Sequence, residues 1–381
     1  MTGYIKIVFI CGSLEPGKDG VGDYTRRFSA ELISRGHQVG IVAINDRNLS
    51  QEFTGSQQFE DITISVFRIP ASVSQNERFK RAAGWIENFD PQWLSLQFVP
   101  FAFNKRGLPF GIGKLFQKLG KSRRWHIMIH ELWVGMDREA NFKFVLWGWV
   151  QMRLIQSMLK RIKFLRINTQ TDLYLKMIGK IGFQSHYLPL FGNIPVALSL
   201  KPGSACSELK ETERKLISFV VFGGIHLEAP IGQFAKELRI YGNEKCIDFK
   251  LRIIGRCGSD QKRWVQEWED EGLSVEVFGE QPNEFVSEVL SSSNMGISST
   301  PIALIEKSGS FAAMREHGLN VICISRPWNP RGYSNQILPN GAMEYKQGSG
   351  IEILKAILSK STKSESAEVV QQFVDNLLVY K

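Results

Sequence analysis

The sequence predicts an α/β fold made of two doubly wound halves. Strand and helix patterns alternate in the first half, the alternation returns in the second, and the stretch between them has no periodicity. A chain of 381 residues is long enough for about two domains. We expect an N-terminal domain over 1–195, a linker over 196–214, a second domain over 215–360, and a closing helix within 361–381 that packs back on the first domain.

Short apolar runs alternate with helical patterns in the first half. Because parallel strands need crossover helices, this alternation indicates a parallel sheet. The predicted strands are Ile5–Cys11, Gln38–Ile44, Ile62–Ile69, Trp93–Phe98, His126–His130 and Phe164–Asn168. The predicted helices are Tyr24–Arg35, Asn76–Phe89, Phe110–Leu119 and Phe142–Ile162.

The second half repeats the scheme. Its predicted strands are Leu216–Phe222, Phe249–Ile254, Ser274–Phe278, Met295–Ile297 and Asn320–Ile324. Its predicted helices are Ile231–Tyr241, Arg263–Glu271, Asn283–Ser292 and Ser310–His317, and Glu365–Val379 closes the chain. Open sheets of this kind bind ligands beyond the carboxyl ends of their strands, so we expect a cleft that faces those ends in both halves.

The composition is that of a globular protein, with 43% hydrophobic and 22% charged residues. The five cysteines are scattered and form no Cys-x-x-Cys pair, which argues against a disulfide framework or a zinc ribbon. No leader pattern precedes the first strand, and charged or polar residues interrupt the apolar stretch Phe142–Leu159. We therefore expect a soluble cytoplasmic protein.

Positive charge is concentrated in the first half. Residues 1–195 hold 26 lysines and arginines against 15 acids, whereas the remainder is nearly neutral. Lys105–Arg124 contains seven basic residues and Arg153–Arg166 five, with no acid in either. Such stretches indicate an anionic partner, namely lipid headgroups, an anionic substrate or nucleic acid; the alternative is a solvated face.

A glycine-rich segment, Gly12–Gly22, follows the first strand and leads into a helix. Glycines let a ligand approach the backbone closely, and helix-start amides favour an anion. The loop is too long for a dinucleotide fingerprint and lacks its third glycine, which argues against a nicotinamide-dependent dehydrogenase. The alternative is a merely flexible loop.

Segments in both halves resemble one known family. Gly20–Val39, with the sequence GVGDYTRRFSAELISRGHQV, is similar to the opening of retaining GT-B glycosyltransferases of the family-4 type. Val275–Gly279, Met295–Ser298 and the stretch from Thr300-Pro301 to Val321 resemble the donor-binding half of the same family. The resemblance implies two Rossmann-like domains facing across a cleft, and transfer of a sugar from a nucleotide-diphosphate donor to an acceptor hydroxyl on a glycan or a lipid-linked saccharide.

The segment Glu306–Ser310 offers what this reaction needs. Negative charge develops on the leaving diphosphate, and backbone amides at a helix start together with a lysine would stabilise it. We expect Glu306 and Lys307 to be catalytic, and Ser308, Gly309 and Ser310 to bind the donor. A plain helix cap by Ser308 or Ser310 is the structural alternative, and a capped helix start can still bind phosphate.

The sequence departs from the family pattern in the second half. The family usually has two glutamates eight positions apart; Glu306 fits the first, but position 314 is Met and the nearest acid is Glu316. The usual Arg and Lys after the first strand of this domain are missing, and Lys307 and Arg256 are the substitutes we nominate. The protein is therefore a divergent relative or, alternatively, an inactive nucleotide-binding scaffold.

The other candidate residues follow the same resemblance. His130 is expected to contact the donor sugar, and Glu131 either orients it or contacts the acceptor. The remaining predicted donor-binding residues are Gly22, Gly223, Gly224 and Arg256. The remaining predicted acceptor-binding residues are Gly20, Asp23 and Asn104, with Asp19 or Asp23 alternatively serving as a turn or cap residue.

No cofactor and no metal are expected. His130 has no histidine partner at helical spacing, and Asp-x-Asp occurs nowhere. The acidic run Glu267–Glu271 is interpreted as a solvated face. A sugar-nucleotide epimerase or a phosphorylase on the same fold would need signatures that we do not find.

The helix around Arg153–Arg166 places Arg153, Lys160 and Lys163 opposite Ile155, Met158, Leu159 and Ile162. Such a helix either packs on the sheet or, together with Lys105–Arg124, docks on anionic lipid at the inner face of the membrane. Neither basic stretch interleaves aromatic residues as a stacking platform does, so no nucleic-acid partner is expected.

Overall fold

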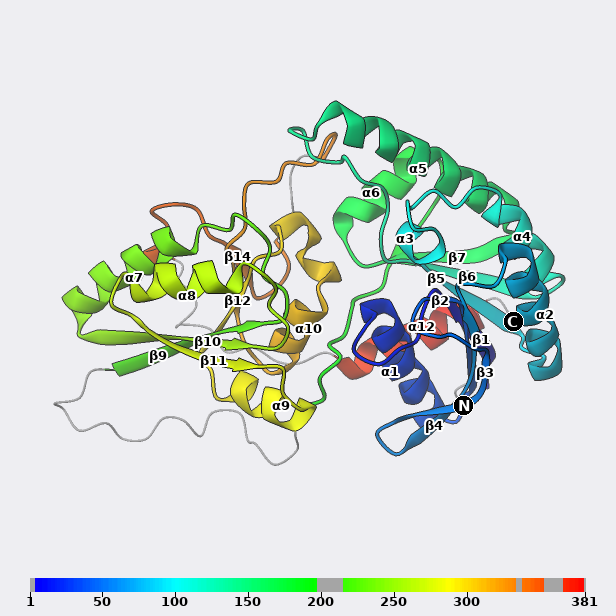
Figure 1. The fold of residues 1–381 in the computed structure, drawn as a ribbon, viewed down its shortest axis with the longest axis horizontal. Coiled ribbons are helices and arrows are strands. Elements are labelled where there is room, and N and C mark those ends of the chain that lie inside the picture. The colour runs from blue at the N-terminus through cyan, green and yellow to red at the C-terminus, as the bar shows by residue number, and fades with distance from the viewer. Residues whose placement is uncertain (1–3, 197–214, 334–337, 353–365, 380–381) are drawn as a thin grey trace. The chain divides into compact units, whose positions relative to one another are not determined.

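The computed structural model describes residues 4–196, 215–333, 338–352 and 366–379, so that most of the predicted linker lies outside the described residues (Figure 1). The chain forms two compact units. The first unit is Met1–Pro189 together with Asn329–Tyr333 and Ala367–Lys381. The second unit is Leu190–Trp328 together with Ser334–Ser366. Each unit is built on its own sheet.

The first unit has an eight-stranded sheet in the order β3-β4-β2-β1-β5-β6-β7-β8. All neighbours are parallel except β3 and β4, which form an antiparallel hairpin at the edge. The strands are β1 Lys6–Cys11, β2 Gln38–Asp46, β3 Phe53–Phe59, β4 Ile62–Pro70, β5 Trp93–Phe98, β6 Arg124–Ile129, β7 Phe164–Thr169 and β8 His186–Tyr187. The chain winds outward in both directions from β1 and β5, which gives the doubly wound topology.

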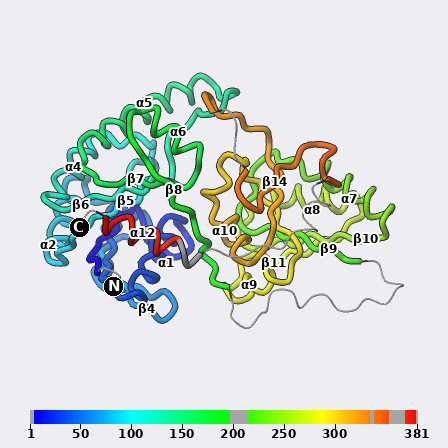
Figure 2. Tube along the Cα trace, turned by 180° about the vertical axis from the view of Figure 1, so that it is seen from behind, coloured from blue at the N-terminus to red at the C-terminus, as the bar shows by residue number. Residues whose placement is uncertain are grey.

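Helices cover this sheet, whose central strands are buried and mainly apolar, although Ser95, Gln97 and His126 are buried polar members of them. The helices are α1 Gly20–Ser34, α2 Gln75–Phe89, α3 Pro100–Phe103, α4 Ile112–Gly120, α5 Phe142–Arg161, α6 Asp172–Lys180 and α12 Ser366–Leu378. The last of these comes from the far end of the sequence (Figure 2). Its Phe373 contacts the rings of Phe9, Phe28 and His126 at centroid distances of 6.2, 4.8 and 5.0 Å. The C-terminal helix thus completes the core of the first unit.

The second unit has a six-stranded parallel sheet in the order β11-β10-β9-β12-β13-β14. The strands are β9 Lys215–Phe222, β10 Ile247–Ile254, β11 Ser274–Gly279, β12 Met295–Ser298, β13 Val321–Cys323 and β14 Ala342–Glu344. The helices are α7 Ile231–Lys245, α8 Gln261–Glu269, α9 Asn283–Ser291, the 3₁₀ helix η1 Ile302–Lys307 and α10 Gly309–Glu316. Numbered within the unit, the strand order is 3-2-1-4-5-6, as in dinucleotide-binding folds, and the order reverses between β9 and β12.

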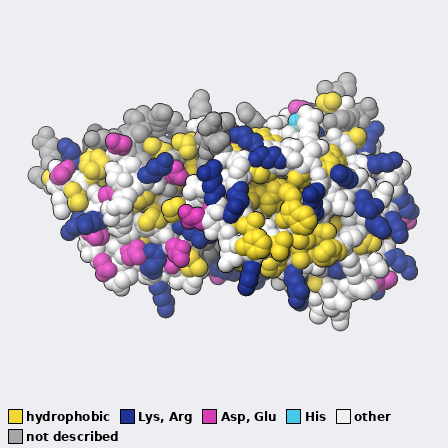
Figure 3. All heavy atoms as spheres, turned by 90° about the horizontal axis from the view of Figure 1, so that it is seen from above, with side chains coloured by type: hydrophobic (Ala, Val, Ile, Leu, Met, Phe, Trp, Pro, Cys, Tyr) yellow, Lys and Arg dark blue, Asp and Glu magenta, His cyan; other side chains and the backbone are white. Residues whose placement is uncertain are grey.

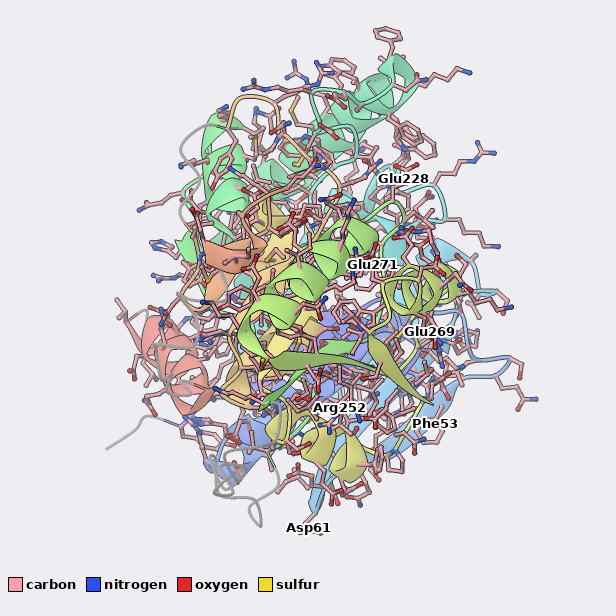
Figure 4. All side chains as sticks on the ribbon, turned by 90° about the vertical axis from the view of Figure 1, so that its left-hand side faces the viewer. Phe53, Asp61, Glu228, Arg252, Glu269 and Glu271 are labelled. Carbon is pink, nitrogen blue, oxygen red and sulfur yellow. The ribbon has the colours of Figure 1, made fainter. Side chains whose placement is uncertain are left out.

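The structure confirms the predicted α/β class with two parallel-sheet, Rossmann-like units. Six elements were not predicted, namely strands β3, β8 and β14, helices α3 and α6, and the 3₁₀ helix η1. Strand β3 is polar and largely exposed, so its sequence carries no apolar run to reveal it. It turns into β4 at Glu60 and Asp61, and Phe53 and Asp61 are labelled on this hairpin (Figure 4).

Candidate functional site

The strand order of the second unit places a candidate ligand site beyond the ends of β9 and β12. Gly223 follows β9 directly and has φ +78°, a conformation that favours glycine. Its amide donates to the carbonyl of Ile254 at the end of β10 (3.0 Å). A β-carbon at Gly223 would lie 2.6 Å from Oγ of Ser310. The end of β9 and the start of α10 are therefore in close contact.

The start of α10 is capped and accessible. Oγ of Ser308 accepts from the amide of Phe311 (3.3 Å), so Ser308, one of the two cap residues considered, is the N-cap of α10. A β-carbon at Gly309 would have no heavy atom within 4 Å, so a ligand would have room beside the first helical amides. The structure thus brings together the predicted donor-binding residues Gly223, Ser308, Gly309 and Ser310.

Serine side chains hold the loop that follows β9. Oγ of Ser299, which follows β12, accepts from the amide of His226 (2.8 Å) and donates to the carbonyl of Gly224 (3.4 Å). Oγ of Ser298 accepts from the amide of Thr300 (3.2 Å). The two bonds of Ser299 fix the loop against the end of β12, although Gly224 itself is exposed and would have room for a β-carbon.

Positive charge converges on this loop. The pKa of His226 is lowered first by partial burial and then by the positive charges of Lys307 and Arg326. Arg326 also lies 3.8 Å from Glu228, which is labelled in Figure 4. Lys307 was predicted from the sequence, whereas His226 and Arg326 were not. A signal for Arg326 was present, because a basic residue shortly after a parallel strand, here β13, lies at the ligand-binding end of the sheet.

Arg256 follows β10 but is engaged elsewhere. Its guanidinium donates to both carboxylate oxygens of Glu280 (3.1 and 2.7 Å). Both side chains are exposed, and the ion pair raises the pKa of Arg256. The predicted role of Arg256 in holding a diphosphate would require this pair to open.

The place of the family's second glutamate is part of the core. Met314 is fully buried, and a β-carbon at Gly296 would lie 2.5 Å from its sulfur. The neighbouring acid, Glu316, lies at the far end of α10, where Oε1 accepts from the amide of Gly192 (2.9 Å). Glu306 lies at the opposite end, in the last turn of η1 beside Lys307. The structure therefore places Glu306, and not Glu316, at the start of α10.

The glycine-rich loop of the first unit is tied down by carboxylates. Asp19 is the N-cap of α1 and accepts from the amides of Val21 and Gly22, both at 2.9 Å. A β-carbon at Gly22 would lie 2.7 Å from the carbonyl oxygen of Ser13. Asp23 accepts from the amide of Gly17 (3.0 Å) and pairs with Arg26 within the same helix. Asp19 thus serves as a cap residue, one of the two roles considered for it, while Gly20 at the helix start is exposed.

Asp46 at the end of β2 holds the start of the glycine-rich loop by hydrogen bonds. Its carboxylate accepts from Oγ of Ser13 (2.9 Å), from the amide of Leu14 (3.2 Å) and from Nε of Arg68 (2.8 Å). Burial alone would raise its pKa, but these hydrogen bonds outweigh burial and lower it. The loop is therefore built on a buried ion pair.

His130 follows β6 and is buried in a chain of polar side chains. Its Nε2 donates to Oε1 of Gln97 (2.8 Å), and its Nδ1 accepts from Nε2 of Gln170 (3.0 Å). Gln97 continues the chain by donating to Ser95 (2.8 Å). Both ring nitrogens are thus occupied, so a direct bond from His130 to a sugar would displace a glutamine. Glu131 follows it and is half-buried.

The chain of polar side chains continues to a second buried histidine. Oγ of Ser95 lies 2.8 Å from Nδ1 of His126, whose Nε2 lies 3.2 Å from Oδ1 of Asn168. Burial, the largest effect, lowers the pKa of His126 to about 3. The imidazole is therefore neutral at physiological pH.

Two further predicted features have structural partners. Oδ1 of Asn104 accepts from the amides of Arg106 (2.8 Å) and Leu108 (3.3 Å), which closes a turn after α3. The acidic run at the end of α8 is mainly a surface feature: Glu269 is exposed, and Glu271 pairs with Arg239 at 2.9 Å (Figure 4).

Within the described residues, no group of three or more His, Cys, Asp or Glu side chains is placed to hold a metal ion. In the same part of the chain, no helix has both the length and the apolar character needed to cross a membrane.

Comparison with solved structures identifies the fold. No protein-family model and no curated protein matches the sequence. Sucrose-phosphate synthase from Thermosynechococcus elongatus aligns at TM-score 0.58 and 13% identity, over 97% of this chain and 92% of its own. The catalytic domain of starch synthase IV from Arabidopsis thaliana, bound to ADP and acarbose, aligns with a TM-score of 0.53 and 11% identity. The alignment covers 98% of this chain and 95% of the starch synthase chain. The lipopolysaccharide outer core galactosyltransferase WaaB aligns with a TM-score of 0.51 and 15% identity, over 98% of each chain.

These similarities define the class of fold. The chain has the GT-B architecture of glycosyltransferases, and it is similar to them along nearly its whole length.

Proposed function

We propose that this protein is a glycosyltransferase that uses a nucleotide-diphosphate sugar. The second unit would hold the donor, and the first unit would hold an acceptor hydroxyl on a glycan or a lipid-linked saccharide. The observation that carries the proposal is the contact between Gly223 and Ser310, which brings the end of β9 and the start of α10 together at the switch point of the sheet.

The chemistry of the site favours a leaving diphosphate. Amides at the start of α10 point their partial positive charge away from the helix, and Lys307 adds a full charge. After partial burial, which is the largest cause, the positive charges of Lys307 and Arg326 lower the pKa of His226, and this supports their placement near the loop after β9. Charge that develops on a departing phosphate would be stabilised by donors that are already in place.

We assign Lys307 to the diphosphate and Glu306 to a hydroxyl of the donor. His130 is assigned to positioning at the end of β6, because glutamines occupy both of its ring nitrogens. Transfer with retention of configuration and without a metal remains part of the proposal through the resemblance to the family. The solved neighbours support a nucleotide donor, because starch synthase IV was captured with ADP.

The decisive experiment has a binding arm and a turnover arm. Uridine and adenosine diphosphates should raise the melting temperature, since a ligand at about 100 times its Kd stabilises the fold by roughly 2.7 kcal/mol. Lys307→Ala should abolish this shift, and Lys245→Ala, an exposed lysine at the end of α7, should not. A panel of nucleotide sugars should then reveal hydrolysis or transfer that Glu306→Gln removes and Glu288→Gln on α9 keeps. Binding without turnover across the panel would indicate an inactive scaffold.

A further inference from the structure

The solvent-facing side of helix α5 is apolar in its first half. Phe142, Leu146, Trp149 and Arg153 follow one another at spacings of four, three and four residues, so they lie on one face of the helix. Phe142 is 76% and Trp149 51% exposed. Leu146 is 52% exposed. We call these three apolar side chains, Phe142, Leu146 and Trp149, the α5 patch. Phe144 is equally exposed, but it lies about 200° around the helix from Phe142 and so belongs to another face.

The α5 patch is a true concentration of apolar side chains. Sixteen large hydrophobic residues are exposed in the described part of the chain, and the three of the α5 patch fall within the eight positions 142–149. Figure 3 shows hydrophobic side chains gathered on the face that carries α5, with Lys and Arg side chains around them. Apolar clusters of this kind on a protein surface mark interaction sites.

The opposite side of α5 is fixed against the first unit. Gly148 approaches the loop so closely that a β-carbon would lie 1.9 Å from the carbonyl oxygen of Val134. Gln151 accepts from the amide of Val134 (2.9 Å) and donates to the carbonyl of Gly107 (3.2 Å). Nε1 of Trp147 donates to the carbonyl of Arg106 (3.0 Å). The helix cannot rotate its apolar face inward without breaking these contacts.

Basic residues surround the α5 patch, and α5 itself contains no acid. Lys143 and Arg153 are exposed on the helix, and the guanidinium of Arg153 lies 5.3 Å from the ring centroid of Trp149. Lys105 and Arg106 are exposed on the loop that accepts the bond from Trp147. A second copy of the chain is a poor occupant, because a two-fold contact would set these like charges against each other.

The structure changes the interpretation of the basic helix. Ile155, Met158, Leu159 and Ile162 are buried against the unit, so the apolar face of Arg153–Arg166 is not available to a partner. The available apolar surface lies one to three turns earlier in the sequence, where the aromatic residues are.

We propose that the α5 patch docks the first unit on a membrane containing anionic phospholipid. Aromatic and aliphatic side chains would enter the boundary between headgroups and acyl chains, while the surrounding lysines and arginines contact the lipid phosphates. The convex helix face suits a planar interface, whereas single-stranded nucleic acid is bound in grooves. The inference does not depend on sugar transfer, since docking needs neither donor nor acceptor.

Vesicle sedimentation of the full chain tests the proposal. The protein should bind phosphatidylglycerol-containing vesicles and bind pure phosphatidylcholine vesicles much more weakly. The triple variant Phe142→Ser, Leu146→Ser, Trp149→Ser should lose at least about tenfold in partitioning, since it removes the groups that enter the interface. The matched control Leu216→Ser, Ile240→Ser changes exposed apolar residues of the second unit and should bind as the wild type does.

The charges require a separate pair of variants. Lys143→Glu with Arg153→Glu should weaken binding to anionic vesicles at least about twentyfold, because each basic residue near such a surface contributes about fivefold. Lys245→Glu with Lys262→Glu, exposed positions of the second unit, is the control. In the wild type, brominated phosphatidylglycerol should quench tryptophan fluorescence, and Trp149→Phe should reduce the quenching while keeping the binding.

Four results would overturn the proposal. These are the absence of binding to anionic vesicles, equal binding to neutral vesicles, an equal loss in the control variants, or patch variants that change only self-association or oligonucleotide binding. None of these four results would affect the test of donor binding, because nucleotide affinity is measured without lipid.

Discussion

A β-carbon placed on Gly223 would lie 2.6 Å from Oγ of Ser310, although the two residues are 87 positions apart. This contact couples the loop after β9 to the first turn of α10. The next residue, Gly224, would have no heavy atom within 4 Å of a β-carbon and has no positive φ. An added methyl group is therefore disfavoured at Gly223 and tolerated at Gly224, so the two positions form a matched pair for mutation.

Gly223→Ala should weaken nucleotide binding by at least about tenfold, because the strained backbone and the clash push the strand end and α10 apart. Gly224→Ala should keep the affinity within about twofold, since the added methyl group meets open space and allowed backbone. Isothermal titration with uridine or adenosine diphosphate measures both. Equal losses in the two variants would mean that the contact does not organise the site.

Gly148→Ala should destabilise the first unit by about 2–4 kcal/mol, because its β-carbon would overlap the carbonyl oxygen of Val134. The control substitution should have the opposite effect on stability. Gly84→Ala lies at an exposed position of α2 with open space around it, and it should stabilise the protein by about 0.5–1 kcal/mol because alanine favours the helix more than glycine does. Urea unfolding curves measure both changes. A neutral Gly148→Ala would show that α5 is not held tightly against the loop.

The buried ion pair beneath the glycine-rich loop should be costly to break. Asp46→Asn removes the charge of the fully buried partner of Arg68, which keeps its second partner Glu15 (2.6 Å), and should cost about 1–3 kcal/mol of unfolding free energy. The comparison is Glu52→Gln, which removes an exposed partner of Arg81 and should cost less than about 1 kcal/mol. Similar effects of the two substitutions would contradict the burial assigned to Asp46.

His126 should make stability depend on pH. In the folded protein the pKa of His126 is lowered to about 3, whereas in the unfolded chain it is about 6.5. Between these two pH values the unfolded chain binds a proton at His126 and the folded chain does not. Stability is therefore lost as the pH falls, by about 2 kcal/mol between pH 7 and pH 5. His126→Gln should lack this component, so that its unfolding free energy changes less over the same interval. An unchanged slope in the variant would assign the effect to other groups.

Much of the fold could be predicted because the buried strands are short, mainly apolar segments that alternate with helical patterns. The predicted strand Trp93–Phe98 has the bounds of β5, and the helix Asn283–Ser292 ends one residue beyond α9. The polar hairpin strand β3 has no such signal and was missed. Helix α4 begins at Ile112, later than the expected Phe110, because Gly111 with φ +72° precedes it.

The site could be predicted only in part, since local motifs do not report what the fold brings together. The cap residue Ser308 was visible from a small-residue segment before a helix. The convergence of His226, Lys307 and Arg326 joins two loops and the end of η1, and no sequence pattern links them. The same holds for the outward face of α5, which is set by the contacts of Gly148 and Gln151 on its other side.

The position of Phe373 among Phe9, Phe28 and His126 has a consequence for synthesis. Domains generally fold in the order in which the ribosome delivers them. In this chain the strands of the first unit are synthesised first, but Phe373, which completes their core, is synthesised only after the second unit. The first unit can therefore complete its core only at the end of synthesis. A gene fragment cut after residue 195 would encode a unit in which Phe9, Phe28 and His126 lack their contacts with Phe373.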